Sequence, residues 1–320
     1  MKGEQYGRVN HGGTPSDISH TAAGAATFGT MTIETTRVQA NGMTFECLTA
    51  GDSGPLALCL HGFPDTAHGW RHVLPALAEA GYRAVAPFMR GYAPSDVPAD
   101  GNYQTGALAL DAVGLHEAFG GDGDAVLIGH DWGALAVYAA AAAAPERWRR
   151  VVAAAVPPAP AMASAFFSFT QLKRSWYMFF FQLPFADFVV PMDDLAYIDQ
   201  LWRDWSPGHD CDEDMAHIRA ALGTPENLAA ALGYYRVTWG TTPSDPAIDA
   251  QQATWAAVPP QPTLYLHGRN DGCIGVEFAE NAADGLAAGS RVHIIENAGH
   301  FIQVEQPAEF TRVVLDFLSQ

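Results

Sequence analysis

Apolar side chains recur along the chain in two different patterns, alternation in the first strands and continuous runs after them. Near the start, residues 32–38 and 43–48 alternate between apolar and polar positions, and residues 40–42 (Ala-Asn-Gly) separate them. Alternation with period two is typical of strands with one buried face, and Asn-Gly is a strong turn signal between paired strands. These residues predict an antiparallel hairpin. Residues 1–30 mix Gly, Ser, Thr and charged residues without either pattern and predict a disordered or tag-like tail.

From residue 56 onward, continuous apolar runs alternate with longer segments of helical period. Runs that are apolar throughout are typical of parallel strands buried on both faces, and the segments between them suit crossover helices. The predicted strands are residues 56–60, 84–87, 125–128 and 151–155. The predicted helices are residues 67–80, 104–119 and 133–144. This order predicts an α/β protein with a mostly parallel central sheet flanked by helices.

Between residues 157 and 261 the alternation stops, and the segment is rich in aromatic side chains and prolines. Such a segment predicts a helical insertion that forms a cap, or lid, on the core. Strand signals return at residues 263–266 and 292–295, and residues 307–318 predict a closing amphipathic helix. The predicted organisation is an α/β core of residues 31–156 and 262–320 with a helical cap of residues 157–261.

The composition narrows the classes of partner. Hydrophobic residues make up 48% of the 320 residues and charged residues 16%, which is typical of a globular chain. The 17 Lys and Arg against 35 Asp and Glu leave a net charge of −18. Because this charge repels polyanions, we expect neither nucleic acid nor a membrane surface as a partner. The oligomeric state stays open, with a homodimer as one option.

The cysteines and the apolar stretches indicate the cellular compartment in which we expect the protein. The four cysteines are widely spaced and form no Cys-x-x-Cys pair: Cys47, Cys59, Cys211 and Cys273. This spacing favours reduced thiols over a disulfide framework. The most apolar stretch, residues 178–192, is interrupted by prolines and an aspartate and is too short to span a membrane. Since residues 1–30 also lack the apolar core of a secretory signal, we expect a soluble cytoplasmic protein.

The strongest chemical signal is residues 126–134, Val-Leu-Ile-Gly-His-Asp-Trp-Gly-Ala. The pattern is a buried strand, a turn of small residues and a helix, which is the context of a nucleophile elbow. The central residue is Asp131, where the Gly-x-Ser-x-Gly form has serine. A carboxylate is ionised near neutral pH, so it can attack an electrophilic carbon without an activating base. The alternative is that Asp131 only caps the following helix.

Other segments supply groups that suit a carboxylate nucleophile. The sequence His-Gly-Phe-Pro ends an earlier strand, and its loop can direct the Phe63 N–H toward the Trp132 N–H, so that the two form an oxyanion hole. Asp271 follows a late predicted strand, and His300 follows the last one. The chain order Asp131, Asp271, His300 matches the nucleophile, acid and histidine order of the α/β-hydrolase fold.

On these motifs, residues 32–320 resemble an α/β-hydrolase of the epoxide hydrolase type. His-Gly-Phe-Pro at residues 61–64 and Gly-His-Asp-Trp-Gly at residues 129–133 both match motifs of that group. The segment Arg-Gly-Tyr-Ala-Pro-Ser-Asp at residues 90–96 is similar to the group's Arg-Gly-Tyr loop, for which we expect a structural role.

The resemblance implies roles for two cap tyrosines. In the family, two such tyrosines donate hydrogen bonds to the epoxide oxygen, and Tyr177 and Tyr235 occupy the matching places here. Tyr234 competes with Tyr235 for the second place. The implied reaction is attack by Asp131 on an epoxide carbon, followed by hydrolysis of the resulting ester by water that His300 activates. The alternative is that the tyrosines only pack the interior of the cap.

Two rival functions remain beside the hydrolysis of hydrophobic epoxides to diols. A haloalkane dehalogenase uses the same carboxylate and histidine, but it needs side-chain donors for a halide, and Phe63 has none. A ligand-binding protein of the same fold would need no turnover at all. The implied partners are a small hydrophobic epoxide and water, and no metal or organic cofactor is expected.

Overall fold

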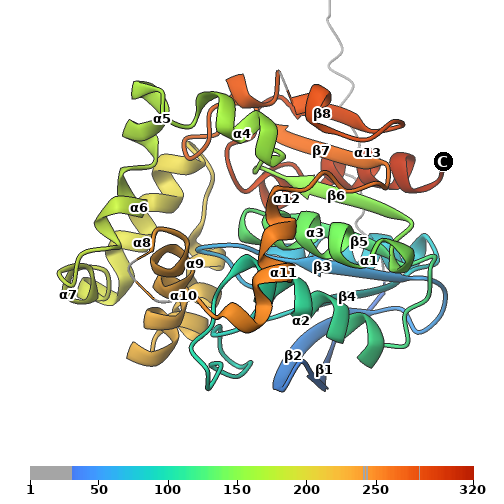
Figure 1. Cartoon of the computed structure of the whole chain (residues 1–320), viewed down its shortest axis with the longest axis horizontal. Coiled ribbons are helices and arrows are strands. Elements are labelled where there is room, and N and C mark those ends of the chain that lie inside the picture. Colours follow the sequence, from blue (N-terminus) through green and yellow to red (C-terminus); the bar gives the residue numbers. More distant parts are fainter. Residues whose placement is uncertain (1–30, 241, 243, 281) are drawn as a thin grey trace, which may run out of the picture.

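The computed structural model describes residues 31–320 except 241, 243 and 281, so the tail predicted for residues 1–30 lies outside the described residues. Its centre is an eight-stranded sheet in the order β1-β2-β4-β3-β5-β6-β7-β8 (Figure 1). The strands are β1 (Glu34–Ala40), β2 (Met43–Ala50), β3 (Leu56–Leu60), β4 (Arg83–Pro87), β5 (Val126–His130), β6 (Arg150–Ala154), β7 (Thr263–Gly268) and β8 (Arg291–Ile295). β2 pairs antiparallel with β1 and β4, and the remaining pairs are parallel, which confirms the mostly parallel sheet.

Local sequence explains where the strands form. The β1–β2 hairpin turns at Asn41 and Gly42, whose φ angles of 44° and 74° lie in the left-handed region that Asn-Gly favours. β3, β5 and β7 are buried along their whole length, so their sequences show continuous apolar runs instead of alternation. Every predicted strand is present, with ends that differ by at most two residues.

Helices cover both faces of the sheet. The helices of the core are α1 (Val73–Glu79), α2 (Thr105–Ala118), α3 (Trp132–Ala143), α12 (Ile302–Glu305) and α13 (Pro307–Leu318). α2 and α3 pack together on one face, and α1 and α13 pack together on the other (Figure 1). The predictions of helices at 104–119, 133–144 and 307–318 are confirmed.

The prediction of one helix over residues 67–80 is wrong. A 3₁₀ turn, η1 (Ala67–Trp70), comes first, and α1 begins only at Val73, after His72. Pro75 explains the break, because proline lacks an N–H and its ring clashes with the preceding turn in a helix interior, whereas the first turn tolerates it. The α-helix therefore begins just before this proline.

The chain between β6 and β7 is helical, and residues 169–238 form an insertion consistent with a cap (Figure 1). The α-helices of this region are α4 (Ala159–Ala165), α5 (Phe169–Arg174), α6 (Trp176–Phe180), α7 (Ala186–Val189), α8 (Met192–Trp205), α9 (Asp212–Leu222), α10 (Pro225–Thr238) and α11 (Asp249–Gln252). This region also holds the 3₁₀ turns η3 (Pro246–Ile248) and η4 (Ala253–Ala256), whereas η5 (Val276–Phe278) and η6 (Ala282–Gly285) lie between β7 and β8. α11 and η4 pack against α2 and α3 of the core. The predicted domain limits at residues 156 and 262 stay a prediction.

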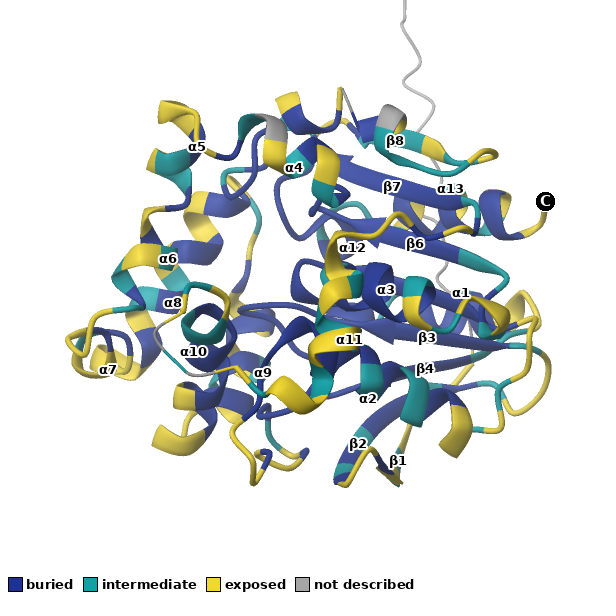
Figure 2. Cartoon of the chain, viewed as in Figure 1, coloured by how far each residue is buried: buried dark blue, intermediate teal, exposed yellow. Residues whose placement is uncertain are grey.

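The outer side of the cap differs from the sheet in its surface. The central strands β3, β5 and β7 are buried, whereas α5 and α7 show exposed stretches (Figure 2). Phe169 and Phe188 on these helices are 85% and 74% exposed. Within the described part of the chain, none of the helices has both the length and the apolar character needed to cross a membrane.

Candidate active site

Asp131 lies at the sharp bend between β5 and α3. Its φ of 52° and ψ of −116° fall in a region that is strained for any residue except glycine. Glycines on both sides make the bend feasible: a Cβ at Gly129 would collide with the backbone of Gly133, and one at Gly133 would collide with the backbone of Leu60. The predicted elbow geometry is therefore present, and it places Asp131 beyond the carboxyl end of β5.

The carboxylate of Asp131 faces the oxyanion-hole loop, not its own helix. Its side chain makes no capping hydrogen bond to α3, so helix capping does not describe its contacts. Instead, Oδ1 accepts a hydrogen bond from the Phe63 N–H at 2.8 Å. Trp132 is the first residue of α3, so its N–H has no acceptor within the helix. The Phe63 N–H thus contacts the carboxylate, and the role of the Trp132 N–H as the second donor stays a prediction.

His61 fixes the loop that carries Phe63. Its Nδ1 donates to the Gly62 carbonyl at 2.9 Å, and its Nε2 accepts from the Met89 N–H at 3.0 Å. Burial lowers the pKa of this imidazole to about 4, so it stays neutral and keeps one donor and one acceptor. His61 therefore joins the loop after β3 to the chain after β4 and does not face the reacting centre.

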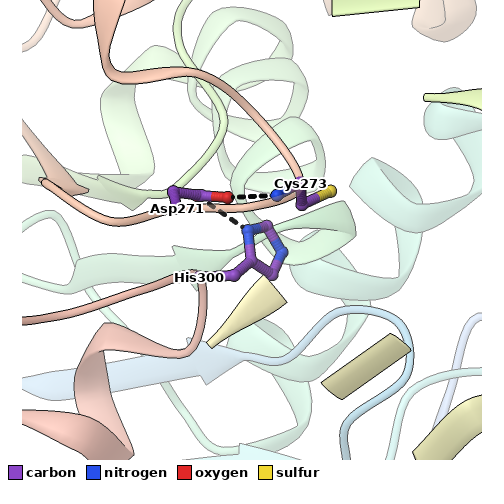
Figure 3. Close-up of side chains that lie close together, drawn as sticks. All are labelled: Asp271, Cys273 and His300. Carbon is purple, nitrogen blue, oxygen red and sulfur yellow. Dashed lines mark hydrogen bonds and ion pairs between the residues drawn. The ribbon is translucent and has the colours of Figure 1, made fainter. Parts of the chain in front are cut away.

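His300 and Asp271 form a hydrogen-bonded pair beside the elbow (Figure 3). Nδ1 of His300 donates to Oδ2 of Asp271 at 2.9 Å, and Nε2 lies 3.7 Å from Oδ2 of Asp131. The other oxygen of Asp271 accepts from the N–H groups of Cys273 and Ile274 at 2.7 and 2.8 Å. The three residues predicted from chain order therefore meet at one point, and all three are buried.

The charge of His300 and the charges of the two carboxylates shift one another's pKa values. Burial alone lowers the pKa of His300, but the carboxylates of Asp271 and Asp131 outweigh it and raise the pKa to about 10. Burial raises the pKa of Asp271, yet the neighbouring imidazolium outweighs this and lowers it below its ordinary value. The two carboxylates therefore favour the protonated form of His300.

The backbone of His300 is held from the cap by residues that the sequence did not reveal. Its N–H lies 3.0 Å from both the Trp205 carbonyl and the Ser206 Oγ, at the end of α8. The Ser206 hydroxyl donates to Glu305 at 2.5 Å, and the same carboxylate accepts from the Gly299 N–H at 2.7 Å. No sequence signal marks these residues, because Ser206 and Glu305 lie 99 positions apart.

The predicted cap tyrosines lie together over the elbow. The rings of Tyr177 and Tyr235 are 5.7 Å apart, and the ring of Tyr235 lies 5.2 Å from that of Trp132. The Tyr235 hydroxyl is buried with no hydrogen-bond partner among the described residues, whereas the Tyr234 hydroxyl donates to the Arg90 carbonyl at 2.8 Å. The Tyr234 hydroxyl is thus bound to the core, whereas the Tyr235 hydroxyl lies beside the Trp132 side chain, and Tyr235 stays the predicted second donor.

Cys273 is a further side chain at this site, which the sequence marked only as a reduced thiol. Its Sγ lies 3.3 Å from the Tyr177 hydroxyl, and its backbone N–H serves Asp271. Ligand atoms of Asp271, Cys273 and His300 lie within 4.8 Å of one another (Figure 3). One oxygen of Asp271 is hydrogen-bonded to His300, and the other is hydrogen-bonded to two backbone N–H groups. These atoms are therefore engaged in the hydrogen bonds of the Asp271–His300 pair and are not arranged as metal ligands. Its position two residues after Asp271 was the only available signal.

Comparison with known proteins agrees with this geometry. Residues 55–307 match the family described as alpha/beta hydrolase fold. The chain is 31% identical to epoxide hydrolase A of Mycobacterium tuberculosis, over 88% of this chain and 96% of that protein. It is similar to the crystal structure of epoxide hydrolase A from Mycobacterium thermoresistibile, with a TM-score of 0.75, 29% identity and coverage of 90% and 98% of the two chains. An inhibitor complex of Bacillus megaterium epoxide hydrolase is similar at a TM-score of 0.76 and 25% identity, over 89% of this chain and all (100%) of that one. The chain belongs to the α/β-hydrolase family, within its group of epoxide hydrolases.

Proposed function

We propose that this protein hydrolyses hydrophobic epoxides to vicinal diols through a covalent ester on Asp131. The observation that carries the proposal is the Asp131 carboxylate at the strained elbow, with one oxygen on the Phe63 N–H and the other facing His300 at 3.7 Å. The relatives named epoxide hydrolase support the same reaction class. Each step follows from the groups around this carboxylate.

The first step opens the epoxide ring. Oδ1 of Asp131 is held by the Phe63 N–H, so Oδ2 is the attacking atom. A bond forms from Oδ2 to an epoxide carbon, the carbon–oxygen bond of the ring breaks, and the oxygen takes a proton as it leaves. Burial raises the pKa of the Tyr177 and Tyr235 phenols well above the ordinary value, so both are protonated donors for this oxygen.

The second step hydrolyses the ester. Esterification removes the charge of Asp131, which is one of the groups that hold the proton on His300, so the pKa of His300 falls once the first step is complete. The proton of His300 passes to the phenolate that the first step leaves. Neutral Nε2 then takes a proton from water, and the hydroxide attacks the ester carbonyl carbon. The Phe63 and Trp132 N–H groups stabilise the oxyanion, and collapse expels the diol oxygen, which takes the proton back from His300. The Asp131 carboxyl then passes its own proton to His300, which restores the carboxylate. Formation of the ester thus converts His300 from a protonated imidazolium to a neutral imidazole that can act as a general base.

Aromatic rings surround the carboxylate and set the substrate class. Phe63 lies 5.5 Å from the Phe181 ring and 5.2 Å from the Tyr235 ring, and Tyr177 lies 4.8 Å from Trp205. Such walls favour an apolar substrate. Two phenol donors suit a developing alkoxide, and for this reason we place epoxides ahead of haloalkanes, which would need a halide site.

The test traps the covalent ester. In His300→Gln, the first step should proceed and the second should fail, so mass spectrometry after addition of styrene oxide should find an adduct on the peptide that contains Asp131. The wild-type protein should form diol and accumulate no such adduct. An adduct on another residue, or bromide release from 1-bromobutane with no diol from styrene oxide, would overturn the proposal.

A further inference from the structure

Cys273 joins the acid loop to a cap tyrosine. Its N–H donates to Asp271, its carbonyl accepts from Gln171 of α5 at 2.9 Å, and its Sγ lies 3.3 Å from the Tyr177 hydroxyl of α6. Gln171 also accepts the Gly275 N–H through its Oε1 at 3.1 Å, so the cap holds both sides of this loop. Each polar group of Cys273 therefore has a partner, and the sulfur is fixed in place.

The direction of the thiol–phenol contact decides what Tyr177 can do. If the phenol donated to sulfur, its only proton would be withheld from the epoxide oxygen. Phenol oxygen is the better acceptor of the two, since sulfur is a weak one. Burial, together with Asp271 and Asp131, raises the pKa of the thiol well above its ordinary value, so a proton is always present to donate.

We propose that the Cys273 S–H donates to the Tyr177 oxygen and directs the phenolic hydrogen toward the reacting epoxide oxygen, which makes Cys273 a positioning residue for ring opening. This inference rests on the proposed function. In the transition state the phenol oxygen gains negative charge as its proton moves to the alkoxide. A second donor on that oxygen then strengthens, because hydrogen bonds in a chain polarise one another.

The test is a double-mutant cycle read in single turnovers with styrene oxide. Cys273→Ala should slow the alkylation of Asp131 about five-fold, the size expected for one weak neutral hydrogen bond, and should leave ester hydrolysis unchanged. Cys273→Ser should recover part of the loss, because its hydroxyl can donate. In a Tyr177→Phe background, Cys273→Ala should have no further effect on alkylation.

Two controls separate this role from packing. Cys47 on β2 is equally buried, and Cys47→Ala should leave the alkylation rate at the wild-type value. Thermal midpoints of all variants, measured by circular dichroism, show whether each one folds. An equal loss from Cys273→Ala with and without the Tyr177 hydroxyl, or no loss at all, would overturn the positioning role. Absence of any Asp131 adduct in His300→Gln would instead overturn the proposed function.

Discussion

The core and the cap hold their polar groups at the site by different means. At the strand ends of the core, backbone N–H groups fix the carboxylates: Phe63 binds Asp131, and Cys273 and Ile274 bind Asp271. In the cap, ring packing fixes Tyr235, whose ring lies 5.2 Å from those of both Phe63 and Phe181 and whose hydroxyl has no partner among the described residues.

Because of this difference, we expect the core to determine whether the reaction occurs and the cap to determine which substrates react. A carboxylate held by backbone donors keeps its place when neighbouring side chains change, because every residue type except proline has a backbone N–H. A phenol held by rings moves when any of those rings changes size. We therefore expect core variants to abolish turnover outright and cap variants to change the rate of ring opening and the preference among substrates.

The largest effect is expected on the core side. Asp131→Ala removes the only group proposed to attack carbon, so diol formation from styrene oxide should fall by about four decades or more. Asp131→Ala leaves the Phe63 N–H without its acceptor and removes one of the two carboxylates beside His300, so circular dichroism is used to check its fold. Asp131→Gly serves as the second variant: it lacks the same carboxylate but accommodates the positive φ of 52°, so its free energy of unfolding in urea titrations should exceed that of Asp131→Ala by about 1 kcal/mol. Retention of activity in either variant would place the nucleophile elsewhere.

The cap side predicts a smaller loss with a matched control. Tyr177→Phe or Tyr235→Phe removes one hydrogen-bond donor and keeps the ring. By analogy with oxyanion-hole donors, the activation free energy of alkylation should rise by about 2 to 4 kcal/mol, which lowers the rate by about two to three decades. Stopped-flow single turnovers measure this rate. Tyr234→Phe loses only its bond to the Arg90 carbonyl and should open epoxides at the parent rate, with a stability cost of about 1 kcal/mol. Parent rates in all three variants would mean that the tyrosines only pack the cap.

His300 also introduces an effect on stability, not on rate: the free energy of unfolding should depend on pH. Because its pKa is raised from 6.5 to about 10 in the folded protein, its contribution is complete below pH 6.5 and is lost as the pH rises toward 10. One proton gives a slope of at most about 1.4 kcal/mol per pH unit. Asp131→Asn removes one of the two carboxylates responsible, so urea titrations between pH 6 and 10 should show a shallower decline. Equal slopes would show that Asp131 does not hold the proton.

The core could be predicted from the sequence because its signals are local. Buried runs such as Leu56–Leu60 identify parallel strands, and the small residues around Asp131 identify the elbow. Catalytic groups at strand ends follow from chain order, since carboxyl ends of parallel strands meet at one edge. The break before Pro75 went unpredicted because the apolar period continues across it, although the backbone does not.

The arrangement of the cap helices could not be predicted from the sequence in the same way. Its helices are short, and in α8 three successive residues, Asp193, Asp194 and Leu195, have positive φ angles of 50°, 55° and 63°. Aspartate visits this region as a single residue, but a run of three residues that includes leucine is not indicated by residue type. The contacts of Cys273 and Ser206 join segments about 100 positions apart, which no single sequence can indicate.

The link from Ser206 to the histidine loop constrains how the molecule can open. Because the end of α8 is hydrogen-bonded to His300, Gly272 and Glu305, this end of the cap has to travel with the core. Gln171 of α5 and Tyr177 of α6 are bound in the same way to the loop that carries Asp271. Opening the cap at either place would break hydrogen bonds to the loop of His300 or to the loop of Asp271. The contacts that hold the histidine and its carboxylate in place thus also fasten the cap to the core at two separate points.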